Sequence, residues 1–269
     1  GADGAEIGAV RALTQSLTGL LTKEGATHVA VAFDHVIESF RNALFPGYKT
    51  GEGIDPDLLS QFPLAEEATR ALGFACWPMV ELEADDALAA AAARLARESR
   101  VTEVRLCSPD KDLMQRVVDA RVVVVDRRRG KVYDADGVME KLGVAPASVP
   151  DLLALVGDAA DGIPGLPGWG AKSAAAVLRR FERLDAIPTN PADWGDLAVR
   201  AKAKLAATLA EQRAAAELYR ELATLRLDAE IDASLDALAW RGPDSDALAS
   251  LASRLDDPGL PERVPGGPR

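Results

Sequence analysis

The sequence contains very few of the residues that most disulfides and transition-metal sites require. Among 269 residues there are two cysteines, Cys76 and Cys107, and two histidines, His28 and His35. A disulfide framework and a cysteine–histidine zinc site are therefore excluded, and a reducing compartment is expected. If the protein binds a metal, carboxylates must hold it.

Long apolar runs are also missing. No stretch approaches the roughly 18–20 apolar residues of a membrane span, and the N-terminus lacks the basic-then-apolar pattern of a signal peptide. We therefore expect a cytoplasmic protein without a membrane partner. The chain is still 48% hydrophobic, which is enough to bury one large core or two modest ones.

Basic residues are in deficit. Lysine and arginine number 31 against 42 aspartates and glutamates, which gives a formal charge of −11. Nucleic-acid-binding domains are usually basic, so the overall charge taken alone argues against a nucleic-acid partner.

What the sequence does contain is alternating helix and strand patterns up to about Pro150. Apolar spacing predicts helices over residues 7–21, 64–72 and 84–98, and strands over 27–33, 101–107 and 122–125. Residues 35–61, rich in proline and glycine, predict a long connection. Strands that alternate with helices are typical of an α/β fold with a mostly parallel sheet flanked by helices.

The character of the chain changes after Pro150. A short apolar helix is predicted over residues 151–156, a turn-rich stretch follows, and 171–227 is almost entirely helix-forming. We therefore expect an α/β domain over 1–150, a helical region over 151–240 and an extension over 241–269. The last dozen residues are rich in proline and glycine, which predicts a disordered end.

Acidic residues cluster where the predicted elements end or begin. They close the first strand, follow the second strand, open the helix at 84–98 and occupy the turn after residue 156: Asp34; Asp110 and Asp112; Glu83, Asp85 and Asp86; Asp158 and Asp161. The carboxyl ends of parallel strands share one edge, so these acids can converge there. Converging carboxylates repel one another unless a cation binds, and oxygen-only ligands favour Mg²⁺ or Mn²⁺. Two such ions are a standard device for phosphodiester hydrolysis.

Each acid also has a simpler interpretation. Asp85 and Asp86 suit the first turn of any helix, and Asp34 suits a cap. Asp158 and Asp161 suit an ordinary turn, and the acids around Lys111 suit a solvated loop with a weak ion pair. The occurrence of all of them together in an α/β context favours the metal site.

Seven short motifs, in order and spacing, carry a resemblance to a known family. They are VAFD (31–34), SFR (39–41), GYK (47–49), LEADD (82–86), SPDKD (108–112), GDAADGIPG (157–165) and LPGWGAKSA (166–174). Together they resemble the 5′ nuclease superfamily of bacterial 5′–3′ exonucleases and flap endonucleases, which includes the N-terminal domain of DNA polymerase I. The resemblance covers about residues 7–230.

The resemblance implies a resolvase-like (PIN-like) α/β domain followed by a helix–three-turn–helix region. It implies a metal-dependent, structure-specific 5′–3′ exonuclease and 5′-flap endonuclease that acts on DNA in replication and repair by a two-metal mechanism. By this similarity the first ion is held by Asp34, Glu83, Asp85 and Asp86, and the second by Asp110, Asp112, Asp158 and Asp161. A monomer bound to DNA 5′ flaps or 5′ ends, without sequence preference and associated with the nucleoid, is expected.

Basic residues in these motifs are candidates for DNA contact. Lys49 resembles the basic residue of the family's helical arch, and Arg41 the arginine of its SFR motif. An exposed loop lysine and a helix-surface charge are the respective alternatives. Lys111 can contact a phosphate or simply screen the acids on either side of it.

The glycines before residue 171 suggest a second kind of contact. Closely spaced glycines expose backbone N–H groups and a positive helix end to phosphate, and Lys172 adds a charge. This segment resembles the family's duplex-binding motif, so Gly165, Gly168, Gly170 and Lys172 are expected to grip the DNA backbone, with K⁺ as a candidate ion in the Gly165–Gly170 loop. Trp169 is expected to pack between helices.

Two features depart from the family pattern. The family's first strand, which carries a metal-binding Asp, is expected before Gly1, so about 20 further residues are expected upstream. In the arch, Glu52 lies where an arginine is common, which predicts altered flap preference. A free-standing nuclease, without a polymerase region, is the leading interpretation.

Two alternatives remain open at this point. A chain without one catalytic acid can be a DNA-binding protein of the same fold with impaired catalysis. A PIN-like ribonuclease is the other alternative, although the LPGWGAK segment (166–172) argues against it.

Overall fold

The computed structural model describes residues 4–266 of the chain. It contains two compact units. Unit 1 comprises Gly1–Ser39, Gly51–Ala87 and Glu230–Arg269, and unit 2 comprises Phe40–Thr50 and Leu88–Ala229. The division falls inside helix α5 (Ala84–Leu95).

Unit 1 contains a parallel pair of strands, β1 (Ala30–Asp34) and β2 (Ala75–Met79). The register places Ala30 opposite Ala75 and Asp34 opposite Met79, so both strands end at the same edge. The helices of this unit are α1 (Gly8–Thr22), α3 (Pro56–Leu59), α4 (Phe62–Ala71), the start of α5, α11 (Leu235–Leu238), α12 (Ser245–Arg254) and α13 (Leu260–Arg263).

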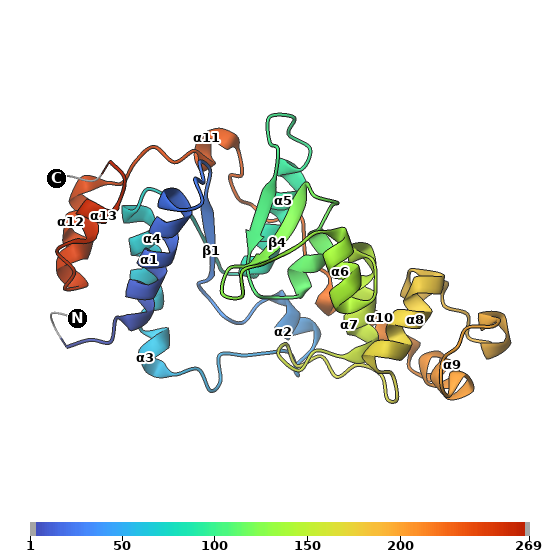
Figure 1. Cartoon of the computed structure of the whole chain (residues 1–269). Helices are drawn as coiled ribbons and strands as arrows, with labels where there is room; N and C mark the ends of the chain where they lie inside the picture. The colour runs from blue at the N-terminus through green and yellow to red at the C-terminus, as the bar shows by residue number, and fades with distance from the viewer. Residues whose placement is uncertain (1–3, 267–269) are drawn as a thin grey trace. The chain divides into compact units, whose positions relative to one another are not determined.

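The core of unit 1 joins both ends of the chain. Helix α4 packs against α1 on one side and α12 on another, as Figure 1 shows. Val10, Leu72, Leu248 and Leu255 are completely buried in this cluster. The C-terminal helices therefore complete the apolar core of the N-terminal ones.

This packing corrects the prediction of a disordered C-terminal end as far as residue 266. Proline and glycine suggested disorder, but α13 forms after Gly259, and Leu260 and Val264 are buried against the unit 1 core. Burial of apolar side chains outweighs the weak helix propensity here. The rest of that prediction, residues 267–269, lies outside the described residues.

Unit 2 is built on a three-stranded sheet with the order β3–β4–β5. Strands β3 (Val104–Cys107) and β4 (Val122–Asp126) are parallel, whereas β5 (Lys131–Tyr133) is antiparallel to β4. All five residues of β4 are buried, as expected for a central strand. Taken over both units, the pairings β1–β2 and β3–β4 are parallel and β4–β5 is antiparallel, which confirms the predicted mostly parallel pairing.

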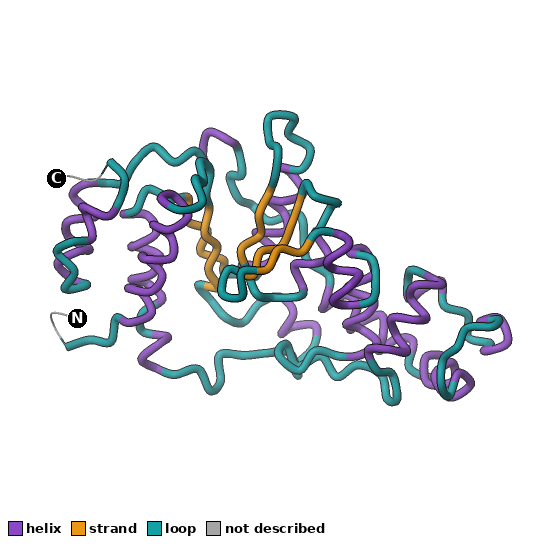
Figure 2. The backbone as a smooth tube through the Cα atoms, viewed as in Figure 1, coloured by secondary structure: helices purple, strands orange, loops and turns teal. Residues whose placement is uncertain are grey.

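Helices surround this sheet and extend beyond it. They are α2 (Phe40–Leu44), the rest of α5, α6 (Ala135–Leu142), α7 (Val149–Val156), α8 (Ala171–Phe181), α9 (Lys202–Glu211) and α10 (Arg213–Ala223), with 3-10 turns at Asp112–Arg116, Pro146–Ser148, Leu184–Ala186 and Pro191–Trp194. Helix α7 packs against both α8 and α10. The region after residue 150 is therefore helical, as predicted, but Figure 2 shows loops between α8 and α9 where the sequence suggested nearly continuous helix.

Several regular elements were not predicted, among them β2, β5, α2, α3, α6 and α12. Strand β2 contains Pro78, which disfavours a strand, but a sheet of only two strands leaves β2 an edge where a missing N–H is tolerated. Strand β5 has three residues, and α2 lies within the stretch expected to be a connection. The sequence does contain signals for helix α6. Asp134 caps its start, and Gly143 ends it with a backbone conformation in the left-handed region.

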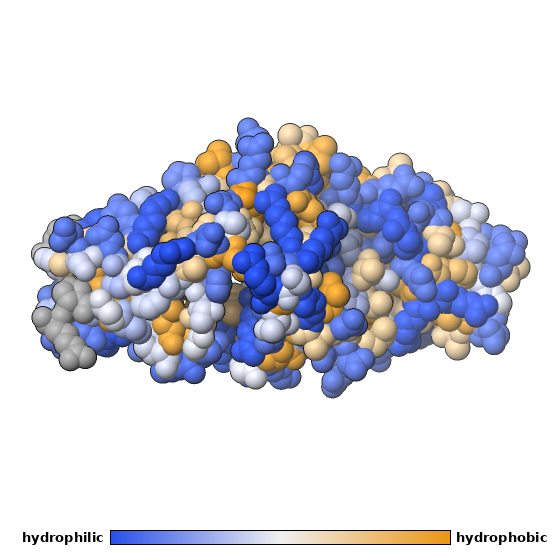
Figure 3. Space-filling view, turned by 90° about the horizontal axis from the view of Figure 1, so that it is seen from above, coloured by the Kyte–Doolittle hydropathy of each residue, from blue (hydrophilic) through white to orange (hydrophobic). Residues whose placement is uncertain are grey.

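The surface shows no broad apolar area on the face drawn in Figure 3, where hydrophilic residues predominate and apolar ones form small groups. Among residues 4–266, no helix combines the length and the apolar character needed to cross a bilayer. The domain boundary predicted near Pro150 stays a prediction.

Candidate active site

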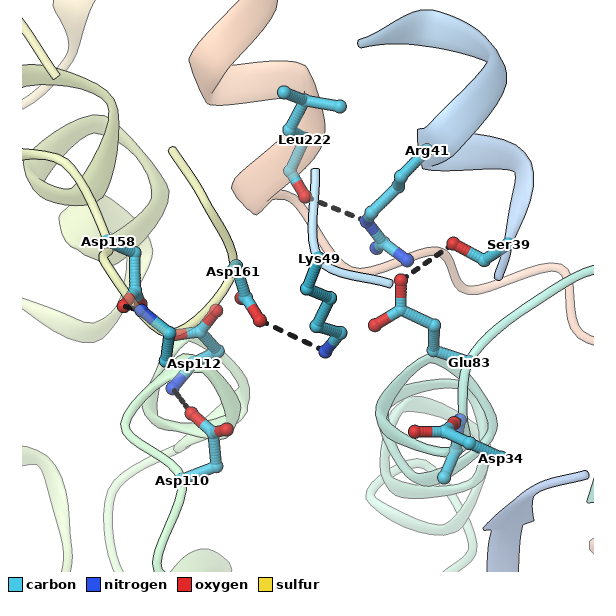
Figure 4. Close-up of polar contacts among 12 residues, drawn as sticks. Asp34, Ser39, Arg41, Lys49, Glu83, Asp110, Asp112, Asp158, Asp161 and Leu222 are labelled. Carbon is cyan, nitrogen blue, oxygen red and sulfur yellow. Dashed lines mark hydrogen bonds and ion pairs between the residues drawn. The ribbon is translucent and has the colours of Figure 1, made fainter. Parts of the chain in front are cut away.

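Three aspartates of unit 2 form a compact buried cluster, called here the acidic triad: Asp112, Asp158 and Asp161. One carboxylate oxygen from each lies within 4.8 Å of the other two, and the three residues are 5%, 6% and 8% exposed. Asp112 begins the 3-10 turn after β3, and the other two lie in the loop after α7. Figure 4 shows their side chains gathered together.

Glycines allow the loop after α7 to fold tightly. Gly157 and Gly162 adopt positive φ, and backbone hydrogen bonds of 2.8 Å join Asp158 and Ile163 in both directions. A Cβ at Gly162 would lie 2.2 Å from the carbonyl oxygen of Gly47, and one at Gly165 would lie 2.4 Å from the Gly157 nitrogen. The motif at 157–165 therefore needs its glycines to bring Asp158 and Asp161 to the triad.

The triad concentrates negative charge away from water. Burial, followed by the charges of Asp110 and Asp161, raises the pKa of Asp112 to about 9. Lys111 opposes this, since its ammonium contacts Asp158 and lies 3.7 Å from Asp112 Oδ1. Burial alone would lower the pKa of Lys111, but the hydrogen bond with Asp158 and the neighbouring acids raise it instead.

The residues of the triad fit a divalent cation. Asp112 Oδ1 is buried without a hydrogen-bond partner among the described residues, and the donor set consists only of carboxylate oxygens. A hard ion such as Mg²⁺ or Mn²⁺ prefers such ligands and would offset the repulsion between them. The triad is therefore a candidate metal centre.

Asp110 lies beside the triad without joining the 4.8 Å group. Its Oδ1 accepts a hydrogen bond from the Asp112 backbone N–H at 2.9 Å, and its own N–H donates to Ser108 Oγ at 3.1 Å. In this structure Asp110 holds the backbone that carries Asp112. Its role as a metal ligand stays a prediction.

Lys49 lies against the triad from another part of unit 2. Its Nζ is 3.0 Å from Asp161 Oδ1, and its backbone N–H donates to the Asp161 carbonyl at 3.0 Å. The carbonyl of Lys49 accepts from Asn42 Nδ2 at 2.9 Å, and the ring centre of buried Tyr48 lies 5.6 Å from Nζ. The GYK segment is thus fixed on the acidic loop.

Arg41, at the start of α2, is 1% exposed. Its Nε donates to the Leu222 carbonyl at 2.8 Å and its Nη2 to the Thr224 carbonyl at 3.1 Å, at the C-terminal end of α10. A guanidinium suits the negative end of a helix, and here it joins α2 to α10. Contact between Arg41 and DNA stays a prediction.

The four acids assigned to a first ion belong to unit 1. Asp34 Oδ1 accepts from the Ala84 N–H at 2.6 Å, and Asp86 Oδ2 from the Glu83 N–H at 2.9 Å, so both cap the start of α5. Glu83 Oε1 accepts from Ser39 Oγ at 2.7 Å (Figure 4). Glu83 and Asp86 are buried and Asp85 is half-buried.

Within residues 4–266, these four acids do not form a group with ligand oxygens inside 4.8 Å. Their assignment to a metal stays a prediction. Ser39 was not singled out from the sequence, although it belongs to the SFR motif; its contact to Glu83 spans 44 positions, so the sequence alone gave no sign of it.

The glycine-rich segment leads into α8 in unit 2. A Cβ at Gly170 would meet nothing within 4 Å and one at Gly168 only a leucine methyl at 3.9 Å, so this backbone is open, whereas Gly165 is buried. A cavity of about 530 Å³ lies here, lined by Gly168, Gly170–Ser173 and Ala198–Ala201, with exposed Lys172 and Arg200 on its wall.

Trp169 confirms its predicted packing role. It is 5% exposed, and its ring centre lies 6.0 Å from that of Trp194, which is fully buried. Both rings belong to the hydrophobic core of unit 2.

Two family models match the chain over most of its length. Residues 1–143 match the model of the 5′–3′ exonuclease N-terminal resolvase-like domain, and residues 144–246 match that of the 5′–3′ exonuclease C-terminal SAM fold. The chain therefore belongs to the 5′–3′ exonuclease family. This confirms both the resemblance and the predicted fold class.

Proteins of two different lengths are similar in sequence to this chain. The chain is 35% identical over 257 residues to DNA polymerase I of Bacillus caldotenax, covering 94% of this chain but 28% of that protein. It is 30% identical over 260 residues to the 5′–3′ exonuclease of Aquifex aeolicus, covering 95% of this chain and 84% of that one. The chain thus spans about a quarter of the polymerases and most of the shorter exonuclease.

Solved structures share the fold. A T5 5′-exonuclease with bound divalent zinc ions superposes with a TM-score of 0.65 at 20% identity, over 95% of this chain and 89% of that one. The catalytic core of Rad2 in complex with a DNA substrate gives a TM-score of 0.57 at 17% identity, over 91% and 78%. At this identity the likeness shows a common fold.

Proposed function

We propose that this protein hydrolyses DNA phosphodiester bonds at 5′ flaps and 5′ ends, without sequence preference, in a reaction that depends on Mg²⁺ or Mn²⁺. The buried acidic triad carries this proposal, since Asp112 Oδ1 has no hydrogen-bond partner among residues 4–266 and the pKa of Asp112 is raised. Binding of a divalent cation would offset the repulsion among these carboxylates. Membership of the 5′–3′ exonuclease family supplies the reaction class.

The chain's own residues divide the work. Asp112, Asp158 and Asp161 would hold one ion, with Asp110 fixing the backbone of Asp112. A bound divalent ion supplies a more acidic water and stabilises negative charge on phosphate oxygens. Lys49, next to Asp161, is placed to bind the phosphate of the 5′ strand.

A second ion belongs to the same proposal, held by Asp34, Glu83, Asp85 and Asp86. Three of these carboxylates accept hydrogen bonds from Ser39 or from the start of α5, which fixes their orientation. Unlike the oxygens of the triad, those of these four acids are not gathered within 4.8 Å of one another in the described part of the chain. If no ion binds to these four acids, the alternative function applies, in which the protein binds DNA but its catalysis is impaired.

We propose that the N-terminal start of helix α8 binds the phosphate backbone of the duplex. The backbone at Gly168 and Gly170 is accessible, and it leads into the N-terminus of α8, the positive end of the helix dipole. Lys172 is exposed and lines the cavity. We assign phosphate contact to Gly168, Gly170 and Lys172, with K⁺ as a candidate ion in the Gly165–Gly170 loop. Gly165 acts mainly by allowing the acidic loop to close. Phosphate gripping of this kind does not read sequence.

One chain supplies every residue of this proposal, so we propose that it acts as a monomer. A DNA substrate would place it at the nucleoid. The match of residues 144–246 to the family's C-terminal model favours a DNA nuclease over a PIN-like ribonuclease.

The test is cleavage of a duplex that carries a 5′-labelled flap, with a blunt duplex and an RNA flap of the same sequence in parallel. Cleavage at the junction with Mg²⁺, none with EDTA, and preference for the DNA flap are expected. Metal-independent products, or cleavage of the RNA alone, would contradict the proposal. DNA binding without cleavage under every metal would support the DNA-binding alternative.

A further inference from the structure

Two ammonium groups lie on the acidic triad. Lys49 Nζ is 3.0 Å from Asp161 Oδ1, while Lys111 contacts Asp158 and lies 3.7 Å from Asp112 Oδ1. Each carboxylate that a divalent ion would need therefore has a lysine beside it. Positive charge is already present where the ion would bind.

The two lysines differ in how they are attached. Lys111 directly precedes Asp112 in the chain, so it stays close to the triad whatever binds there. Lys49 comes from a distant segment, and its backbone is fixed separately by hydrogen bonds to Asp161 and Asn42. Its side chain is 28% exposed, so the ammonium can leave Asp161 toward solvent while the backbone stays in place.

We propose that the ammonium group of Lys49 is the counter-ion of Asp161 in the metal-free protein and competes with the divalent ion for this carboxylate. In the metal-free protein its ammonium neutralises Asp161, and binding of the ion drives it off. The displaced ammonium is then available to a phosphate of the substrate. Metal binding and substrate binding are coupled through this one side chain, and the coupling is reciprocal.

The direction of the effect follows from electrostatics. A single positive charge next to a divalent ion repels it, and at about 5 Å even the dielectric constant of water leaves roughly a tenfold effect on affinity. An orienting lysine would act in the opposite direction, because its removal would loosen Asp161. The sign of the change in metal affinity therefore separates the two roles.

The first experiment measures Mn²⁺ binding by titration calorimetry without DNA. We expect about tenfold tighter binding in Lys49→Met than in the wild-type protein, and wild-type affinity in Lys49→Arg. The matched control is Lys204→Met, which removes the same charge from an exposed position on α9 and should bind as the wild type does. Unchanged or weaker binding in Lys49→Met overturns the proposal.

Lys49→Gln serves as a second neutral variant if Lys49→Met does not fold, which the thermal melt of the metal-free protein reports. The same sign of change is expected. Weaker Mn²⁺ binding in Lys49→Gln overturns the proposal as well.

The second experiment, which rests on the proposed function, measures DNA affinity with and without Mn²⁺ on a flap duplex protected by phosphorothioate linkages. Mn²⁺ should raise the affinity several-fold less in Lys49→Met than in the wild-type protein. An equal gain in both would overturn the coupling.

Failure of this inference can be told from failure of the proposed function. If the wild-type protein binds Mn²⁺ and Asp161→Asn abolishes binding, the metal centre stands, and an unaltered Lys49→Met removes only the role of Lys49. If the wild-type protein binds no Mn²⁺, both are wrong.

Discussion

Replacement of Asp112 by asparagine should stabilise the metal-free protein. The pKa of Asp112 is raised to about 9, mainly by burial and then by Asp110 and Asp161, from an ordinary value of 3.8. Between these two values the folded protein holds a proton that the unfolded chain does not, so the contribution of Asp112 to stability falls as pH rises. An asparagine side chain has no such proton to take up.

The size of the effect follows from the pKa shift. Each pH unit above 3.8 costs the folded state about 1.36 kcal/mol, which amounts to about 4 kcal/mol at pH 7 and about 2 kcal/mol at pH 5. These are upper limits, because water that enters the cluster reduces the penalty. Asp112→Asn should therefore gain more stability at pH 7 than at pH 5.

The assay is urea unfolding in EDTA at pH 5, 6, 7 and 8. Asp136→Asn, an exposed acid at the first turn of α6, is the matched control and should change little at any pH. With saturating Mn²⁺ the order should reverse, because the ion stabilises only the intact triad. A destabilised Asp112→Asn protein at pH 7, or a gain that does not grow with pH, would refute the reasoning.

Three further substitutions, one of them with a matched control, test the site and the residues that support it. Gly162→Ala should lower the free energy of unfolding by more than about 2 kcal/mol, because its Cβ would lie 2.2 Å from the Gly47 carbonyl oxygen. The control is Gly130→Ala, which also has positive φ but has open space around the added Cβ, and it should lose about 1 kcal/mol. Equal losses of the two variants in urea denaturation would contradict this prediction. Arg41→Leu should lose about 3 kcal/mol by the same measurement, since two carbonyls at the end of α10 lose their donor; an unaltered midpoint would show that the cap is dispensable. Lys172→Ala should reduce the slope of log affinity for DNA against log salt by about 1, and an unaltered slope would remove Lys172 from the interface.

The sequence predicted the acidic loop well, because its residues are close together and its glycines are informative. GDAADGIPG shows both the acids and the glycines with positive φ, and alternation of strands with helices placed Asp112 at a strand end. What it could not show is the distance between Asp112 and the loop. That distance depends on the packing of α7 against the 3-10 turn after β3.

The contacts of Arg41 could not be predicted from the sequence. A single arginine in an SFR motif is equally compatible with a DNA contact and with a surface charge. Its acceptors, the carbonyls of Leu222 and Thr224, lie 181 and 183 positions later in the chain. No local pattern encodes such a contact, and the same holds for the burial of Leu260 against the N-terminal helices.

The most direct test of the account is single-turnover cleavage of a 5′-flap duplex in Mg²⁺ by the wild-type protein, Asp161→Asn and Asp136→Asn, with DNA binding measured on the same samples. We expect Asp161→Asn to lose cleavage by at least about 100-fold while it still binds the flap, and Asp136→Asn to cleave as the wild type does. Cleavage by Asp161→Asn at a rate close to that of the wild type would show that the acidic triad is not the metal centre of this protein.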